Sequence, residues 1–279
     1  MRLRVGREIG RRSVNGRVAA ALVTFVLLAA PAAEGQARDE GDAPYRGGAN
    51  LGFDPSGYQQ FNTGYSGDFT FVRLMYRSDP RQAYRNPGWA HDYPVAESNF
   101  GKILDELTTM SPWLGGSNVL AMDDPELFKY PIAYLSEPGY WQLSEAEARN
   151  LRNYLLKGGF LILDDMNGPY QLRNAYEQIK RILPENEIHE LDASHPVFDS
   201  FFHMEEENIR IPHPYGQGTA RYFGFFEHDD PDGRLMIVIN HDNDIGDYME
   251  WSDRGFIPIA LSNEAYKLGV NYVVYALTH

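Results

Sequence analysis

Apolar and β-prone residues alternate or run together in several short segments of the chain. Residues 69–76 alternate in this way and predict a first strand. Residues 118–122 and 132–136 predict two more strands. The continuous apolar run at residues 159–163 is typical of a strand that is covered on both faces. These segments predict a sheet with residues 159–163 at its centre.

Amphipathic helical patterns separate the predicted strands. Helices are expected over residues 97–109, 170–183 and 263–277. The clearest helix opens at Ser144, because Ser144 and Glu147 have the spacing of a capping box, and Gly158 stands where this helix should end. Strands that alternate with helices predict an α/β fold with a doubly wound, mostly parallel sheet.

The last third of the chain has a different pattern of apolar and polar residues. Residues 221–227 and 234–240 flank an Asp-Asp-Pro-Asp-Gly turn, which predicts an antiparallel hairpin late in the chain. Residues 38–66 are rich in Gly, Asn, Ser, Asp and Tyr and lack apolar periodicity, so we expect a linker or a loosely docked arm there. One α/β domain is then expected over residues 67–279.

The first 37 residues have the pattern of a secretory signal peptide. Six arginines come first, an apolar run at residues 18–33 follows at once, and small residues surround two candidate cleavage sites. We expect cleavage near residue 33 or 38 and a periplasmic or secreted protein with no stable membrane span afterwards. An uncleaved anchor is the alternative, although the run is shorter than the roughly 20 residues that a spanning helix needs.

The charge balance excludes one class of partner. The chain has 25 basic and 39 acidic residues, a net charge of −14. Residues 1–37 contain six of the basic and two of the acidic residues, so the rest of the chain carries 19 and 37, a net charge of −18. Such a chain repels nucleic acid. The expected partner is a small polar ligand or another protein.

Asp164 and Asp165 are the first candidate site residues. They end the predicted central strand, and open parallel sheets bind ligands beyond the carboxyl ends of their strands. Asp165 is a candidate metal ligand or general base, and Asp164 a candidate binding residue. The structural alternative is that both only cap the following loop and helix.

His195 is the second candidate. The following proline keeps His195 out of a helix, so the ring is presented from a loop. We expect His195 to meet Asp165 at the carboxyl edge of the sheet and to form a proton-transfer pair or a metal corner with it. A histidine hydrogen-bonded into a turn is the alternative.

Two further segments carry candidate binding groups. The acidic segment 240–247 offers Asp242, Asp244 and Asp247 as candidate metal ligands, with a solvated acidic loop as the alternative, because the glutamate of a calcium-binding EF-hand is missing. The loop at residues 88–94 and the end of the first strand offer a wall of polar and aromatic side chains. Its candidate binding residues are Tyr76, Trp89, Asp92 and Tyr93, with packing of the aromatic rings against the domain as the alternative.

Several catalytic motifs are absent from the sequence. The chain contains no cysteine, no Gly-x-Ser-x-Gly elbow, no phosphate-binding Walker loop, no Gly-x-Gly-x-x-Gly and no His-Glu-x-x-His. A covalent acyl intermediate is therefore not expected. No cofactor motif is evident, and the acidic segments leave a divalent metal as an option.

The order of several motifs resembles the bacterial domain-of-unknown-function family 4159. The most specific part is Gly158-Gly159-Phe160-Leu161 followed by Asp164-Asp165, and His195-Pro196-Val197-Phe198 comes later in the same order. The resemblance covers residues 69–277. It implies the class I glutamine-amidotransferase-like fold, a flavodoxin-type three-layer sandwich. True amidotransferases place a cysteine nucleophile at the sheet edge, and this chain has none.

Three functions remain open from the sequence. The first is a non-catalytic ligand-binding or assembly module outside the cytoplasm. The second is a hydrolase or isomerase that acts on a carbohydrate-like polar substrate through Asp165 and His195, with or without a metal. The third is a structural domain stabilised by calcium at Asp242, Asp244 and Asp247.

Overall fold

A computed structural model describes residues 56–78, 87–215 and 218–279. The predicted signal peptide and the first part of the predicted arm lie outside these residues. All described residues belong to one compact unit. Among the described residues, no helix is both long enough and apolar enough to cross a membrane.

Seven strands of the described chain form one mixed sheet in the order β3-β1-β4-β6-β9-β8-β7. The strands are β1 (Val72–Met75), β3 (Asn118–Ala121), β4 (Ile132–Ser136), β6 (Phe160–Asp164), β7 (His189–Leu191), β8 (Arg221–Phe226) and β9 (Leu235–His241). The strands from β3 to β9 in this order are parallel, whereas β8 and β7 add in antiparallel fashion. The parallel part has the strand order 2-1-3-4-5, which is flavodoxin-like. The predicted α/β fold class and the late hairpin of β8 and β9 are confirmed.

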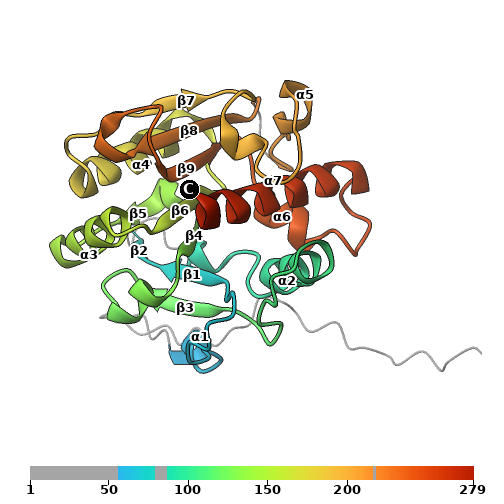
Figure 1. Cartoon of the computed structure of the whole chain (residues 1–279), viewed down its shortest axis with the longest axis horizontal. Helices are drawn as coiled ribbons and strands as arrows, with labels where there is room; N and C mark the ends of the chain where they lie inside the picture. The colour runs from blue at the N-terminus through green and yellow to red at the C-terminus, as the bar shows by residue number, and fades with distance from the viewer. Residues whose placement is uncertain (1–55, 79–86, 216–217) are drawn as a thin grey trace, which may run out of the picture. The chain divides into compact units, whose positions relative to one another are not determined.

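Helices cover both faces of this sheet (Figure 1). The helices are α1 (Ser56–Gln59), α2 (Val95–Leu107), α3 (Glu145–Leu156), α4 (Gly168–Ile182), α5 (Glu206–Ile209), α6 (Ile245–Glu250) and α7 (Ile259–Thr278). Helices α3 and α4 lie on one side of the sheet, and α2, α6 and α7 lie on the other. A two-stranded ribbon of β2 (Arg77–Ser78) and β5 (Trp141–Gln142) stands apart from the sheet.

Strand β6 has the central place that its apolar run predicts. All five of its residues are buried, and β4 and β9 flank it. Its side chains alternate between two hydrophobic cores, because successive residues of a strand point to opposite faces. Leu161 and Leu163 join the core beneath α3 and α4, while Phe160 and Ile162 join the core beneath α2 and α7.

The start of α3 confirms the predicted capping box. The Glu147 amide donates to the Ser144 hydroxyl over 3.2 Å, and the Ser144 amide donates to the Glu147 carboxylate over 2.6 Å. Gly158 follows the helix with a left-handed φ of 104°. This turn sends the chain directly into β6.

Residues 56–66, part of the expected linker or arm, contact the edge strand β3. The Asn62 side chain donates to the Val119 carbonyl over 2.9 Å and accepts from the Val119 amide over 2.8 Å. Thr63 makes a similar pair of bonds with the Asn118 side chain. These bonds occupy backbone groups of an edge that would otherwise stay open to pairing with other chains.

The acidic segment after β9 differs from its predicted form. The sequence leaves a solvated acidic loop as one alternative for residues 240–247, but helix α6 begins inside this segment and Asp244 caps it. Asp244 and Asp247 are only 2% and 8% exposed. The reason is tertiary, because β9 pairs with β6 and returns the segment to the carboxyl edge of the sheet.

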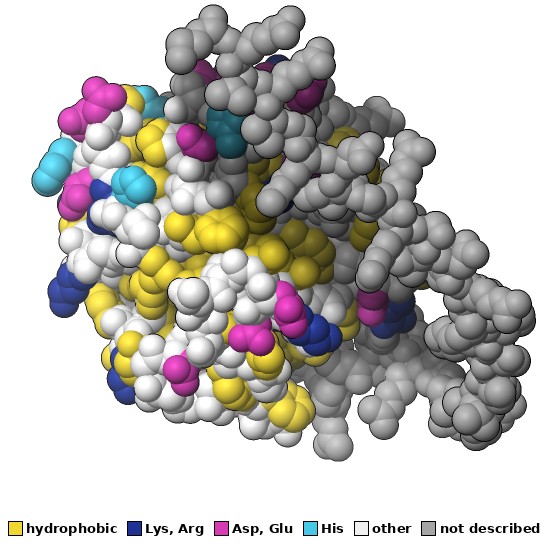
Figure 2. Space-filling model, turned by 45° about the vertical axis from the view of Figure 1, so that its right-hand side comes forward, with side chains coloured by type: hydrophobic (Ala, Val, Ile, Leu, Met, Phe, Trp, Pro, Cys, Tyr) yellow, Lys and Arg dark blue, Asp and Glu magenta, His cyan; other side chains and the backbone are white. Residues whose placement is uncertain are grey.

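Acidic and basic side chains are scattered among exposed hydrophobic ones on the face shown in Figure 2. A denser group of carboxylates lies instead at the carboxyl edge of the sheet.

Candidate metal centre at the carboxyl edge of the sheet

The carboxyl ends of the parallel strands turn sharply. Glu137, Asp165 and Asp242 directly follow β4, β6 and β9, and their φ angles of 49°, 58° and 53° are left-handed. Such angles are uncommon outside glycine and cluster at functional sites. The strand order reverses between β1 and β4, which is where sheets of this topology bind ligands.

Asp164 anchors this edge from within. Its buried carboxylate accepts hydrogen bonds from the Tyr134 hydroxyl and the Asn240 amide, each over 2.8 Å. It also accepts from the amides of Ile245 and Gly246 over 3.3 and 3.0 Å. These four donors occupy the carboxylate, so Asp164 holds α6 against the sheet.

Asp165 faces His213, which comes from the segment between α5 and β8. The Asp165 Oδ1 and His213 Nε2 atoms lie 3.2 Å apart, and the two side chains are 15% and 10% exposed. Burial raises the pKa of Asp165 to about 6, although its bond to His213 opposes this shift. Burial lowers the pKa of His213, but the hydrogen bond and charge of Asp165 outweigh it, so that pKa is raised.

Asp244 completes a first group of metal-ligand atoms. Single ligand atoms of Asp165, His213 and Asp244 all lie within 4.8 Å of one another. Burial, followed by the charges of Asp165 and Asp92, raises the pKa of Asp244 well above its usual range. This first group combines one nitrogen and two oxygens.

A second group shares Asp165 with the first. His91, from the loop after β1, and Glu137, at the end of β4, place ligand atoms within 4.8 Å of each other and of Asp165. His91 Nδ1 lies 2.5 Å from Glu137 Oε1. The hydrogen bond to Glu137 raises the pKa of His91 despite its burial.

A third group consists of carboxylates alone. Asp92, Asp247 and Glu250 have ligand atoms within 4.8 Å of one another. The Oδ2 atom of Asp92 is enclosed without a hydrogen-bond partner, and burial followed by the charge of Asp247 raises the Asp92 pKa well above its usual range. A Cβ atom added to Gly246 would lie 2.5 Å from that oxygen, so glycine is what lets α6 approach it.

The donor types of the first two groups fit a divalent first-row metal ion. Imidazole nitrogen suits zinc, iron and related ions, and carboxylate oxygen suits manganese and calcium, so the mixture favours a first-row ion over calcium. One buried polar atom on the same strands also lacks a partner. Ser136 pairs in register with Asp164, so both side chains point to the same face, and the Ser136 Oγ is buried without a hydrogen bond. A buried hydroxyl of this kind calls for a water or a ligand beside it.

His195 lies at the opposite edge of the sheet from Asp165, so the expected pair does not form. The His195 ring packs 5.6 Å from Phe226, and Phe226 pairs with Leu235, the first residue of β9. Asp165 follows the last residue of β6, which runs parallel to β9. His195 instead accepts a hydrogen bond from the Val197 amide over 3.1 Å, the turn role that was its alternative.

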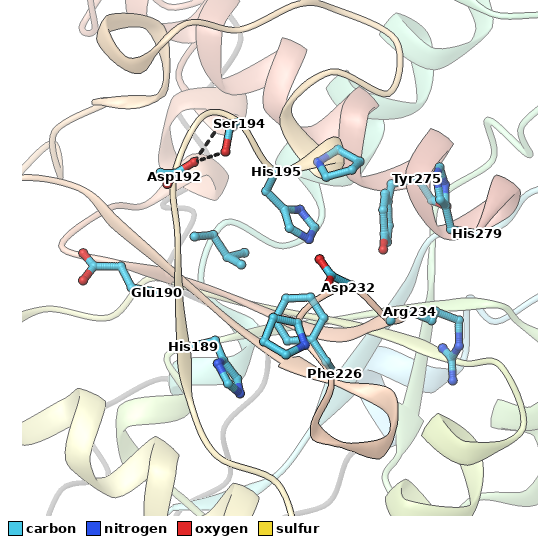
Figure 3. A pocket seen from close by; sticks show the side chains of 14 residues that line it. His189, Glu190, Asp192, Ser194, His195, Phe226, Asp232, Arg234, Tyr275 and His279 are labelled. Carbon is cyan, nitrogen blue, oxygen red and sulfur yellow. Dashed lines mark hydrogen bonds between the residues drawn. The ribbon is translucent and has the colours of Figure 1, made fainter.

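The hollow beside His195 is a separate feature. Figure 3 shows His195, Phe226, Tyr275 and Asp232 around it, with Arg234 farther along the rim. Its volume is about 590 Å³, and aromatic, basic and acidic side chains all line it. It contains none of the residues of the three ligand groups.

The aromatic residues of the predicted recognition wall serve packing. Trp89 is fully buried, with its ring 4.8 Å from that of Tyr58, so it cannot form a surface lip. Tyr76 is 5% exposed and donates to the Glu137 carbonyl over 2.6 Å. Tyr93 packs 5.8 Å from Tyr58, ring to ring. Of this predicted wall, only Asp92 enters a ligand group.

The predicted trio Asp242, Asp244 and Asp247 does not form one site. Asp244 and Asp247 belong to different groups, and Asp242 belongs to none among the described residues. The Asp242 carboxylate instead accepts from the Gly168 amide over 2.7 Å. The structure does not bring the three carboxylates together, because Asp244 caps helix α6 and Asp247 lies within its first turn.

Four members of the ligand groups are not among the sequence candidates: His91, Glu137, His213 and Glu250. The first three carry a readable signal in the sequence. His213 precedes Pro214, the same feature that singled out His195. Glu137 directly follows a predicted strand, as Asp165 does. His91 lies in the loop whose neighbours Trp89, Asp92 and Tyr93 were chosen. Only the fold could show which of these residues meet.

The fold and the site together define a class: a flavodoxin-like α/β protein with a histidine and carboxylate cluster at the switch point of its sheet. The family model described as "Domain of unknown function (DUF4159)" matches residues 70–277. The chain belongs to this family. A sequence search of curated proteins finds no match.

Proposed function

We propose that this protein is a ligand-binding module that holds a divalent metal ion through Asp165, His213 and Asp244. The ion then binds a polar, oxygen-rich ligand at the carboxyl edge of the sheet. The observation that carries the proposal is the convergence of these three side chains, from three separate segments, to within 4.8 Å.

Electrostatics support a bound cation at this place. The three ligand groups together contain six carboxylates and two histidines. Burying like charges side by side is costly unless a partner neutralises them or they take up protons. The raised pKa values of Asp92, Asp165 and Asp244 express this cost in the metal-free protein. A divalent ion neutralises the carboxylates, and the relief of their repulsion contributes to the free energy of ion binding.

The cellular setting and the wider fold relationship are parts of the same proposal. The basic and apolar pattern of residues 1–37 supports export, and the strand order 2-1-3-4-5 supports a relationship to the class I glutamine-amidotransferase-like fold. The chain has no cysteine to serve as the nucleophile of an amidotransferase.

Hydrolysis without a metal ion bound to these residues is the second candidate function, because a histidine nitrogen that ligates an ion cannot also take up a proton. It is favoured by the 3.2 Å contact between Asp165 and His213, which is the geometry of a proton-transfer pair. In that reaction a water loses a proton to the pair while its oxygen bonds to the electrophilic carbon of the substrate. The bond from that carbon to the leaving group breaks, and the leaving group takes up the proton. Asp165 and His213 would occupy the role that the sequence gave to Asp165 and His195.

Thermal unfolding with defined metal content tests the proposed ion. Protein stripped with chelator should melt at a lower temperature than protein with added Mn²⁺ or Zn²⁺, because an ion that binds only the folded state stabilises it. His213→Ala and Asp244→Asn should lose most of the metal-dependent increase. Asp242→Asn, which lies at the same edge outside the ligand groups, should keep it. Equal metal-dependent increases in all four proteins would overturn the proposal.

A further inference from the structure

We propose that the carboxyl edge holds a second divalent metal ion, bound by His91, Glu137 and Asp165, and that the Asp165 carboxylate bridges the two ions. This inference rests on the proposed function, because the first ion shares the bridging residue. It adds a second site and makes the centre binuclear.

Asp165 has the geometry of a bridge. It contributes a ligand atom both to the group with His213 and Asp244 and to the group with His91 and Glu137. A carboxylate has two oxygens and can therefore serve two ions. Its place directly after the central strand β6 puts it between Glu137 on the β4 side and the segment after β9 on the other.

The two ligands that only the second ion would use are held in place by their backbones. The Glu137 amide donates to the Asp164 carbonyl over 3.0 Å, and the Glu137 carbonyl accepts from Tyr76 over 2.6 Å. The His91 carbonyl accepts from the buried guanidinium of Arg73 over 2.9 Å. These contacts aim two ligands at one point before any ion arrives, which preorganises a site.

Glycine makes room for the Glu137 carboxylate. A Cβ atom added to Gly88 would lie 2.2 Å from Glu137 Oε2, so any other residue would displace that oxygen. Gly88 opens the short helical turn η1 (Gly88–Ala90) that leads to His91. With any other residue at position 88, the Glu137 carboxylate would have to leave its place beside this turn.

Charge and donor type point to the same kind of ion. Two divalent ions bring four positive charges to a cluster of six carboxylates and two histidines, where one ion brings only two. Each of the two proposed sites has one nitrogen and two oxygens and leaves coordination positions for water or a ligand. This donor set suits Mn²⁺, Fe²⁺, Co²⁺ or Zn²⁺ better than Ca²⁺, which prefers oxygen ligands alone.

Manganese binding tests this inference and separates it from the first ion. Chelator-stripped protein is dialysed against Mn²⁺, the bound metal per chain is measured by mass spectrometry, and electron paramagnetic resonance reports whether the ions are coupled. We expect two Mn²⁺ per chain with an exchange-coupled spectrum, since paired ions in such centres lie about 3.5–4 Å apart.

Variants assign each ion to its ligands. His91→Ala and Glu137→Gln should each bind one Mn²⁺ with an uncoupled spectrum, and Asp242→Asn should match the parent protein. His91 is 43% exposed as a side chain, so its truncation leaves the core intact, and the melting curve checks this. The affinity for the second ion should fall at least about tenfold in either variant.

Other results overturn the inference in distinguishable ways. One Mn²⁺ per chain that depends on His213 and not on His91 removes the second ion and leaves the first. Two ions with an uncoupled spectrum remove the bridge. No bound Mn²⁺, together with no Zn²⁺ or Co²⁺ under the same conditions, removes both sites.

Discussion

Asp165 unites three properties that seldom occur in one aspartate. It has a left-handed φ of 58°, its side chain is only 15% exposed, and it contacts a histidine across 3.2 Å. The left-handed backbone and the burial of a charged group each lower the stability of the fold unless a partner compensates. Residues that lower stability in this way are characteristic of binding and catalytic sites.

Replacing the Asp165 carboxylate should stabilise the metal-free protein. Between pH 3.8 and about 6 the folded state keeps a proton that the unfolded state has lost, so this group's contribution to stability falls as the pH rises and is fully lost above pH 6. The loss is on the order of 2 to 3 kcal/mol at neutral pH. Asn tolerates left-handed φ and removes the charge.

Chelator-treated Asp165→Asn should therefore melt at a higher temperature than the parent at pH 7.5, and the difference should shrink toward pH 4. With Mn²⁺ added, the melting temperature of the parent should rise substantially and that of Asp165→Asn should not. Asp242→Asn is the matched control, because it removes a carboxylate at the same edge and with similar φ. A variant that is less stable than the parent at pH 7.5 without metal would show that Asp165 serves the fold alone.

Some of these residues could be found from the sequence, and others could not. Asp165 was predicted because a carboxylate at the end of a parallel strand is a local signal. His195 and His213 both precede a proline, so the sequence gives them the same local pattern. Nothing local shows to which edge of the sheet each histidine returns. That information comes from the antiparallel pairing of β8, which places its two ends at opposite edges.

At the scale of elements, a buried contact between β1 and α2 positions the loop that carries His91. Arg73 of β1 forms an ion pair with Glu97 of α2, and both side chains are buried. The same guanidinium donates to the carbonyls of Trp89 and His91 over 2.8 and 2.9 Å. Arg73 thus ties one strand, one helix and the loop that carries His91 together.

Breaking this ion pair should lower the stability of the fold strongly. Arg73→Met leaves Glu97 as an uncompensated buried charge, so the free energy of unfolding in urea should fall by about 3–5 kcal/mol. The double variant Arg73→Met with Glu97→Met should recover much of this loss. Arg173→Met, which breaks the exposed pair with Glu177, should change almost nothing. A loss for Arg73→Met as small as that for Arg173→Met would contradict the assigned role.

The lengths of the elements explain which of them the sequence predicts. A capping box predicts helix α3, and an unbroken apolar run predicts strand β6. Helix α6 has only six residues, too few for an apolar period to emerge, and Asp164 stabilises its start from a distant strand. Its acidic residues therefore resemble a loop when they are seen in sequence alone.

At the scale of the whole molecule, the sheet brings the site together. Alternation of strands and helices predicts a parallel sheet with its carboxyl ends on one side, and this prediction is confirmed. The same rule predicts a site at that edge. It does not say which loops converge, because that depends on the strand order and on the antiparallel extension by β8 and β7.

Anomalous X-ray diffraction from crystals grown with Mn²⁺ tests the central claim most directly. At the manganese absorption edge, we predict a strong anomalous peak within about 2.0–2.3 Å of an Asp165 oxygen and of His213 Nε2. A second peak beside His91 and Glu137 is expected from the bridged pair. Well-ordered density for Asp165, His213 and Asp244 with no anomalous peak between them would contradict a metal centre at this edge.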